Sequence, residues 1–296
     1  MDSYDRGHAM AQQTIIITGA SDGIGAAAAH QLAENGHKVV VVGRSPQKTA
    51  AVAENIGAPF HVADFTDLAQ VWSLARELTA AYPRIDVLAN NAGGIFGDRE
   101  ATTDGYEKTF QINHLAPFLL TNLLMSTLIK SNAKVIQTSS IGARIFGNLD
   151  IDDLQNEKKY SPEKAYGDAK LGNVLFTKEL HRRYADQGIT AVAFHPGNIA
   201  SNFANQSKGL FRFVYNNPMT RLMLSRTEKG GAALTWLAEG TPGVTWLPGE
   251  YYEKNKITKT NPQASDVALA LQLWDRSAAL TGLRTARPRG HEASPS

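Results

Sequence analysis

A glycine-rich segment near the N-terminus constrains the fold more than any other part of the chain. The β-branched run Thr14–Ile17 predicts a buried strand, and it leads directly into Thr18-Gly19-Ala20-Ser21-Asp22-Gly23-Ile24-Gly25. Residues 26–34 favour a helix that stops at Asn35-Gly36, and residues 39–42 favour a second strand. In such a βαβ unit a pyrophosphate can lie against the helix N-terminus. Glycines also make ordinary turns, but in this context they predict a dinucleotide site.

Strand and helix patterns continue to alternate along the chain. Strand-like runs occur at residues 60–63, 85–89, 134–138, 189–194 and 249–252, and helical patterns at residues 46–55, 68–81, 103–111, 115–130, 162–185 and 227–238. This alternation favours a parallel sheet covered by helices on both faces, with the site at the carboxyl ends of the strands. The expected fold class is therefore α/β, with a single-domain doubly wound parallel sheet (a Rossmann fold) over residues 14–280.

Composition excludes several classes of function. The chain of 296 residues has a formal net charge of +2, so its electrostatics do not favour nucleic-acid binding. It contains no cysteine, which excludes disulfides and thiolate chemistry and favours a cytoplasmic location. The eight histidines form no paired ligand motif, so we expect no metal site.

The two ends and one internal segment stand apart from the predicted domain. Residues 1–13 are polar and lack the apolar core of a signal peptide, so we expect a flexible leader. Residues 281–296 are rich in Arg, Pro and Ser and predict a disordered tail. The most apolar internal run, residues 115–125, is too short to span a bilayer. Residues 203–224 are apolar with interspersed Arg and Lys, and they predict a helical lid over an apolar substrate.

Other roles for residues 203–224 remain open. The segment could instead pack against the core of the domain or against a second copy of the chain, which would make a homo-oligomer. A helix lying on a membrane surface is the less favoured alternative.

Polar residues follow three of the predicted strands. Asp64 ends the third strand, Asn91 and Gly93 follow the fourth, and Ser140 follows the fifth. Each residue suits an ordinary turn. Because the carboxyl ends of parallel strands meet at one edge of a sheet, their convergence favours a site.

Tyr166 and Lys170 lie four residues apart on a predicted helix, so both side chains share one face. A free phenol has a pKa of ~10, and a neighbouring ammonium group lowers it towards the working range. A solvated pair on a helix surface would show the same spacing. The glycine-rich βαβ unit upstream favours a catalytic pair.

The end of the second strand predicts the cofactor. A nicotinamide enzyme that prefers NAD carries an acidic residue there, about 20 residues past the glycines, for the ribose 2′-hydroxyl. This chain has Gly43-Arg44-Ser45 instead, and the Arg44 guanidinium and Ser45 hydroxyl suit a 2′-phosphate. A solvated arginine is the alternative, and Asp22 in the glycine turn argues against a phosphate. We predict NADP(H).

Together these motifs resemble the short-chain dehydrogenase/reductase family. The matching residues are Thr18-Gly19-x-x-x-Gly23-x-Gly25, Asn90-Asn91-Ala92-Gly93, Asn113, Ser140, Tyr166-x-x-x-Lys170 and Pro196-Gly197, in the order of the family. Ile112-Asn113-His114-Leu115 and residues 170–176 are similar to the retinol dehydrogenase and WW-domain oxidoreductase branch.

The resemblance implies a role for each catalytic residue. Tyr166 would be the general acid or base at the carbonyl oxygen, and Ser140 would polarise the same oxygen. Lys170 would lower the pKa of Tyr166 and hold the nicotinamide ribose, and Asn113 would position a water that passes protons to Lys170. The substrate would be a small-molecule carbonyl or alcohol.

The resemblance also implies the contacts of the cofactor. The turn residues Thr18, Gly19, Ser21, Gly23, Ile24 and Gly25 would surround the phosphates. Asp64 would face the adenine, Asn91 the adjoining ribose with Gly93 beside it, and Ile199 the carboxamide. Ser201 stands where the family usually has threonine and keeps the hydroxyl.

Two other functions compete with an NADP(H)-dependent oxidoreductase. A non-catalytic NADP(H) sensor that binds partners would not need Asn113, Ser140, Tyr166 and Lys170 for proton transfer. A nucleotide-sugar epimerase also uses Tyr-x-x-x-Lys, but it is expected to have a different glycine spacing and a large second domain.

Overall fold

One eight-stranded sheet runs through the computed structural model, which describes residues 11–197 and 227–283. Its spatial order is β3 (Phe60–Val62), β2 (Lys38–Gly43), β1 (Thr14–Thr18), β4 (Val87–Asn90), β5 (Lys134–Thr138), β6 (Thr190–His195), β7 (Tyr251–Glu253) and β8 (Lys256–Ile257). Neighbouring strands are parallel except for the β7–β8 pair, which is antiparallel.

The chain starts in the middle of the sheet and winds outward in both directions. It runs from β1 to β2 and β3, then crosses back to β4 and continues to β8. Strand order therefore reverses between β1 and β4, and their carboxyl ends leave a crevice where ligands bind in folds of this kind. The predicted α/β doubly wound fold is confirmed.

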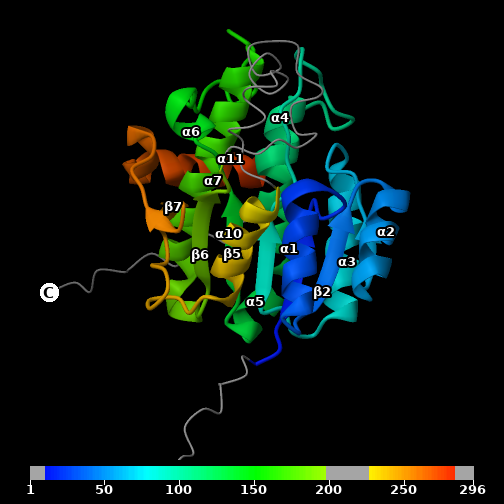
Figure 1. Ribbon diagram of the computed structural model, residues 1–296. Coiled ribbons are helices and arrows are strands. Elements are labelled where there is room, and N and C mark those ends of the chain that lie inside the picture. Colours follow the sequence, from blue (N-terminus) through cyan, green and yellow to red (C-terminus); the bar gives the residue numbers. More distant parts are fainter. Residues whose placement is uncertain (1–10, 198–226, 284–296) are drawn as a thin grey trace, which may run out of the picture.

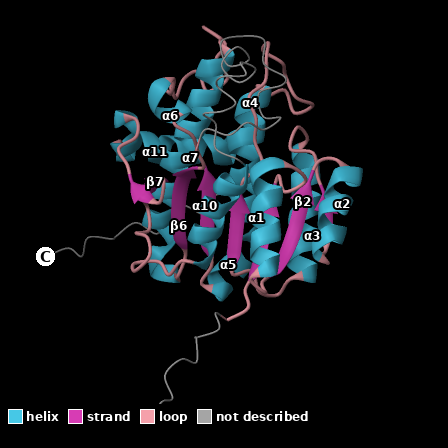
Figure 2. Ribbon diagram, viewed as in Figure 1, coloured by secondary structure: helices cyan, strands magenta, loops and turns pink. Residues whose placement is uncertain are grey.

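Helices cover both faces of this sheet (Figures 1 and 2). One layer holds α1 (Gly23–Glu34), α2 (Pro46–Ile56) and α10 (Thr227–Glu239), and the other holds α3 (Leu68–Ala81), α5 (Ala116–Ser131), α7 (Pro162–Tyr184) and α11 (Val267–Leu280). Side chains alternate along each strand, so Ile15 and Ile17 enter the first core while Ile16 enters the second. This alternation buries the apolar strands on both sides.

The predicted helix over residues 103–111 is wrong for residues 103–107. Ala101 forms a β-bridge with Glu107, and Gly105 adopts a φ of 83°, which a helix does not allow. The Glu107 carboxylate accepts hydrogen bonds from the backbone N–H groups of Thr109 and Phe110 at 2.8 and 2.6 Å, so the helix begins only at Lys108.

From Lys108 the helix continues without the break predicted before residue 115. It consists of α4 (Lys108–Phe110), a π-helical turn (Gln111–Leu115) and α5. Among the described residues it is also the one helix that is long and apolar enough to cross a bilayer, but 78% of its most apolar window is buried inside the protein.

Several short elements and the last helix were not predicted. They are α6 (Gly142–Ile145), two 3₁₀ turns (Ala185–Gln187 and Pro262–Ser265), β8 and α11. α11 packs on α7, where Trp274 contacts Phe118, Phe176 and Tyr184. Most of the predicted leader and tail and all of the predicted lid (203–224) lie outside the described residues.

Candidate active site

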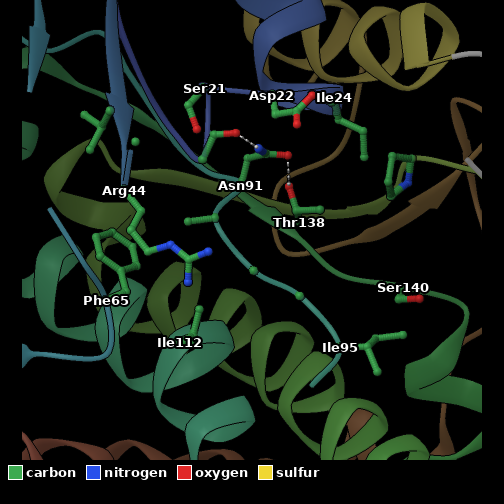
Figure 3. A pocket seen from close by; sticks show the side chains of 18 of the residues that line it. Ser21, Asp22, Ile24, Arg44, Phe65, Asn91, Ile95, Ile112, Thr138 and Ser140 are labelled. Atoms are coloured by element: carbon green, nitrogen blue, oxygen red, sulfur yellow. Dashed lines mark hydrogen bonds between the residues drawn. The ribbon is translucent and has the colours of Figure 1, made fainter. Parts of the chain in front are cut away.

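A cavity of about 440 Å³ opens at the carboxyl ends of the strands (Figure 3). Most of the predicted site residues line it, namely Gly19, Ser21, Gly23, Ile24, Arg44, Ser45, Asp64, Asn91, Gly93, Ser140, Tyr166 and Lys170. Thr18, Gly25 and Asn113 are not part of its lining. Ile199 and Ser201 lie outside the described residues.

The glycine turn fits tightly against the end of β4. Gly19 has a φ of 65°, and a Cβ built on it would lie only 2.7 Å from the Cα of Ala92. At Gly25 a Cβ would lie 2.4 Å from the carbonyl oxygen of Gly19. Only glycine fits these two positions. Gly19 leaves backbone at the wall of the cavity, and Gly25 lets the N-terminus of α1 lie close beside it. This is the cradle that a pyrophosphate requires.

Asn91 and Thr18 fasten the ends of β1, β4 and β5 together. The Asn91 side-chain amide donates to the carbonyl oxygens of Thr18 and Gly19 at 3.0 and 3.2 Å, and its oxygen accepts from the Thr138 hydroxyl at 3.4 Å (Figure 3). The Thr18 hydroxyl accepts from the backbone N–H groups of Asn91 and Ala92. Both polar side chains therefore hold the strand ends at the cavity wall in place by hydrogen bonds.

The end of β2 has no room for an acidic side chain. A Cβ built on Gly43 would lie 2.4 Å from the Thr49 hydroxyl and 2.7 Å from the Cβ of Ser21. Arg44 follows, and its guanidinium reaches into the cavity (Figure 3). Ser45 caps α2, where its hydroxyl accepts from the backbone N–H of Lys48 at 3.4 Å.

Lys48 is a cavity residue that the sequence interpretation missed. Its ammonium lies 3.3 Å from the Asp22 carboxylate, and both side chains are more than half exposed. The other oxygen of Asp22 accepts from the backbone N–H of Gly23 at 2.8 Å and caps α1. Asp22, whose charge disfavours a phosphate at this end of the cavity, is therefore paired with the Lys48 ammonium.

Ser140 and Tyr166 both lie next to Gly142 at the other end of the cavity. A Cβ on Gly142 would lie 3.1 Å from Cε1 of the Tyr166 ring and 3.4 Å from the Ser140 hydroxyl. The Ser140 hydroxyl also accepts from the backbone N–H of Gly142 at 3.1 Å. Both side chains therefore flank the same glycine and line the same cavity.

Lys170 lies beneath this pair, 98% buried. Its ammonium is 5.6 Å from the centre of the Tyr166 ring and donates to the Thr138 carbonyl oxygen at 3.0 Å. A Cβ on Gly93 would lie 3.0 Å from the same nitrogen. Burial lowers the pKa of Lys170 to about 7, so its charge changes in the physiological range.

Asn113 lies in the π-helical turn. Its side chain donates to the carbonyl oxygens of Gly94 and Thr109 and accepts from the N–H of Gly94, which leaves the backbone carbonyl as the group that could hold a water. In an α-helix that carbonyl would accept from residue 117, which is a proline without an N–H. Ala116 donates five residues back, to Gln111. Pro117 therefore leaves the Asn113 carbonyl without its α-helical donor.

Apolar cavity residues were also missed by the sequence interpretation. Ile95 and Phe96 follow the Gly93-Gly94 turn, and Ile95 lies on the side of the cavity that holds Ser140 (Figure 3). Phe65 and Ile112 lie towards Arg44. Their position depends on tertiary folding, and only their closeness to the polar strand ends could have indicated it. His195 and Gly197 complete the wall at the end of β6.

Comparison with known proteins agrees with this geometry. The model of the short chain dehydrogenase family matches residues 13–209. A Streptomyces sp. (strain C5) protein assigned as a daunorubicin C-13 ketoreductase is 39% identical over 277 residues, which cover 91% of this chain and 93% of that protein. Human retinol dehydrogenase 13 is 34% identical over 284 residues, which cover 92% of this chain and 85% of that protein.

Solved structures share the fold. A Mycobacterium paratuberculosis protein superimposes with a TM-score of 0.74 at 29% identity, covering 93% of this chain and 95% of that chain. The NADP complex of Pseudomonas aeruginosa RhlG gives 0.66 at 23% identity, with coverage of 83% and 96%. The NADH complex of Brucella melitensis 3-ketoacyl-(acyl-carrier-protein) reductase gives 0.63 at 22% identity, with coverage of 81% and 95%. The last two likenesses show the fold alone.

Proposed function

The chain belongs to the short-chain dehydrogenase family, and within this oxidoreductase family we propose that it interconverts a carbonyl and an alcohol with NADP(H), using Tyr166 as general acid or base. The observation that carries the proposal is one cavity that Ser140, Tyr166 and Lys170 line together with the glycine turn at the N-terminus of α1.

The residues at the catalytic end divide the proton chemistry between them. The nicotinamide, when bound, supplies the hydride for reduction. Tyr166 donates its phenolic proton to the carbonyl oxygen, and the Ser140 hydroxyl donates a hydrogen bond to the same oxygen. The buried ammonium of Lys170 stabilises the phenolate that remains. A water on the Asn113 carbonyl then returns a proton through Lys170.

Two cations support a preference for NADP(H). Arg44 can present its guanidinium to phosphate oxygens in a bidentate manner, and Lys48 adds a second positive charge on the neighbouring helix turn. Packing at Gly43 disfavours the acid that an NAD-preferring site needs. Solved structures of this fold hold NADP in one case and NADH in another, so the argument depends on the residues of this chain.

The substrate we propose is a large, mostly apolar carbonyl or alcohol. The relatives carry names for the reduction of a daunorubicin ketone and for the oxidation of retinol, and both compounds are bulky and contain a large apolar ring system or chain. Among the described residues, Ile95 lines the cavity on the side of Ser140 (Figure 3) and Phe96 adds a second apolar side chain to the lining, and both suit such a molecule.

A cofactor and substrate panel tests the proposal. We would measure kcat/KM with NADPH and with NADH against small ketones, aromatic ketones, retinal and daunorubicin. We expect turnover of bulky carbonyls and a kcat/KM at least tenfold higher with NADPH. A preference for NADH would contradict the roles of Arg44 and Lys48. Tight NADPH binding without turnover of any carbonyl would favour the sensor alternative.

A further inference from the structure

A buried chain of hydrogen bonds leads from the C-terminal helix α11 to the catalytic lysine. The Thr138 carbonyl accepts from the Lys170 ammonium at 3.0 Å and from the Asn173 side-chain amide at 3.2 Å. The oxygen of Asn173 lies 3.4 Å from Nδ1 of His114, and Nε2 of His114 lies 3.0 Å from the Ser277 hydroxyl in α11. All these side chains are more than 90% buried.

The direction of every hydrogen bond in this chain is fixed. Asn173 donates its amide to Thr138, so its oxygen is left to accept, and Nδ1 of His114 must carry the proton. Burial lowers the pKa of His114 to about 4, so the ring is neutral and has only that one N–H. Nε2 then accepts from the Ser277 hydroxyl. Each donor therefore points towards the Thr138 carbonyl, and such aligned bonds strengthen one another.

Packing around His114 leaves it little freedom. The ring stacks on Phe110 at 5.3 Å, and the edge of Phe176 meets it at 6.4 Å. A Cβ on Gly172 would lie 3.0 Å from Nδ1, so any larger residue there would press on the histidine ring and shift it. The segments Ile112–Leu115 and Lys170–Phe176, which mark the same branch in the sequence, thus meet at His114, Gly172 and Asn173.

We propose that His114 and Asn173 position Lys170 by holding the Thr138 carbonyl to which its ammonium donates. This inference rests on the proposed function. Thr138 ends β5 and comes two residues before Ser140, so the same bond also fixes the strand end that carries the catalytic serine. Neither His114 nor Asn173 lines the cavity, and both act through the lysine.

Three variants and a matched control test the positioning. Asn173→Leu removes the donor to Thr138, His114→Phe keeps an aromatic ring but deletes both nitrogens, and the double variant combines them. The control is Thr121→Val, which removes a buried hydroxyl that accepts from Asn90 at 2.9 Å and donates to the Pro117 carbonyl oxygen at 2.7 Å, so it belongs to other hydrogen bonds than those at Thr138. The control should lose comparable thermal stability.

Two measurements distinguish positioning from general destabilisation. The first is kcat with a carbonyl substrate, which we expect to fall about fivefold to tenfold in each single variant and no further in the double variant, because the residues act in series. The second is the NADPH Kd as a function of pH. In the unmodified protein, affinity should fall as pH rises through the pKa of Lys170, about 7. The midpoint should move by about half a unit in the variants and stay unchanged in the control.

The outcomes separate this inference from the proposed function. If the unmodified protein reduces carbonyls and both variants match Thr121→Val in kcat and in the pH midpoint, the positioning role is overturned. If the two single losses of kcat add up in the double variant, His114 and Asn173 do not act in series, which would also contradict the inference. If the unmodified protein binds NADPH but reduces no carbonyl, the proposed function fails, while the pH midpoints still decide whether His114 and Asn173 act on Lys170.

Discussion

Tyr166 differs from phenylalanine by the one hydroxyl that the proposed chemistry uses. Tyr166→Phe keeps the ring that packs against Gly142, so the cofactor Kd should change less than about twofold while kcat falls by about 10²–10⁴. Tyr106→Phe is the control, because Tyr106 donates to the carbonyl of Leu280 and does not line the cavity. Substantial turnover by the Tyr166 variant would exclude the phenol as proton donor.

Arg44, Lys48 and Asp22 should separate the two cofactors by charge alone. A charge-assisted bond to phosphate contributes about 1.5–3 kcal/mol, so Arg44→Ala should weaken NADPH binding about 10- to 100-fold and leave the NADH Kd nearly unchanged. Lys48→Met should weaken NADPH binding about threefold, since exposed pairs contribute less than about 1 kcal/mol. Asp22→Asn keeps the cap of α1 and removes a negative charge, so it should tighten NADPH binding. Equal effects on NADH would contradict this assignment.

At the scale of elements, the π-helical turn between α4 and α5 can be tested through Pro117. Pro117→Ala restores an N–H four residues after Asn113, so the turn can become α-helical and use the Asn113 carbonyl. Replacing a helical proline by alanine favours the helix by up to about 3 kcal/mol. We therefore expect a higher melting temperature together with at least a fivefold lower kcat. A more stable variant with an unchanged rate would show that the carbonyl holds no catalytic water.

The elements that the sequence predicts well are those whose residues carry the signal locally. Thr14–Ile17 is β-branched and fully apolar at its centre, and the structure has β1 at Thr14–Thr18. The helix after Pro162 has both its proline start and its serine cap in the sequence, and α7 begins there. The error at residues 103–111 arises because the Glu107 carboxylate is buried by distant parts of the chain, and only then does it cap the helix at Lys108.

The same distinction applies to the site. Arg44, Ser140, Tyr166 and Lys170 follow strand ends or share a helix face, so their convergence could be predicted from the topology. Lys48 enters the site because α2 turns back towards Asp22, 26 residues away in sequence, and the spacing of the two residues alone gives no sign of this. His114 gains its partners from α7 and α11, and α11 itself carried no pattern that we assigned.

At the scale of the whole molecule, the switch of strand order between β1 and β4 explains why residues far apart in the sequence share one cavity. The ends of β1 to β6 all contribute to its lining, and α7 brings Tyr166 and Lys170 over them. The hydrogen bond from the Ser139 hydroxyl to the Lys170 carbonyl oxygen, 2.7 Å long, joins β5 directly to that helix. The end of β5 and α7 are therefore held together directly at the cavity.

Lys134 provides a test of how the sheet is joined to α10. It begins β5, and its ammonium donates to the carbonyl oxygens of Ala238 and Gly240 at the end of α10. Burial lowers the pKa of Lys134 to about 8, against the opposing charges of Asp86 and Glu239.

The sign of the pH dependence follows from this lowered pKa. Between pH 8 and 10.5 the folded protein has released the Lys134 proton while the unfolded chain still holds it, so the free energy of unfolding gains up to about 1.4 kcal/mol per pH unit from this site. We would measure urea unfolding of the unmodified protein, of Lys134→Met and of the exposed control Lys130→Met. The free energy of unfolding of the unmodified protein minus that of Lys134→Met should be constant below pH 8 and increase above it. A decrease above pH 8 would mean that folding raises the pKa of Lys134 instead of lowering it.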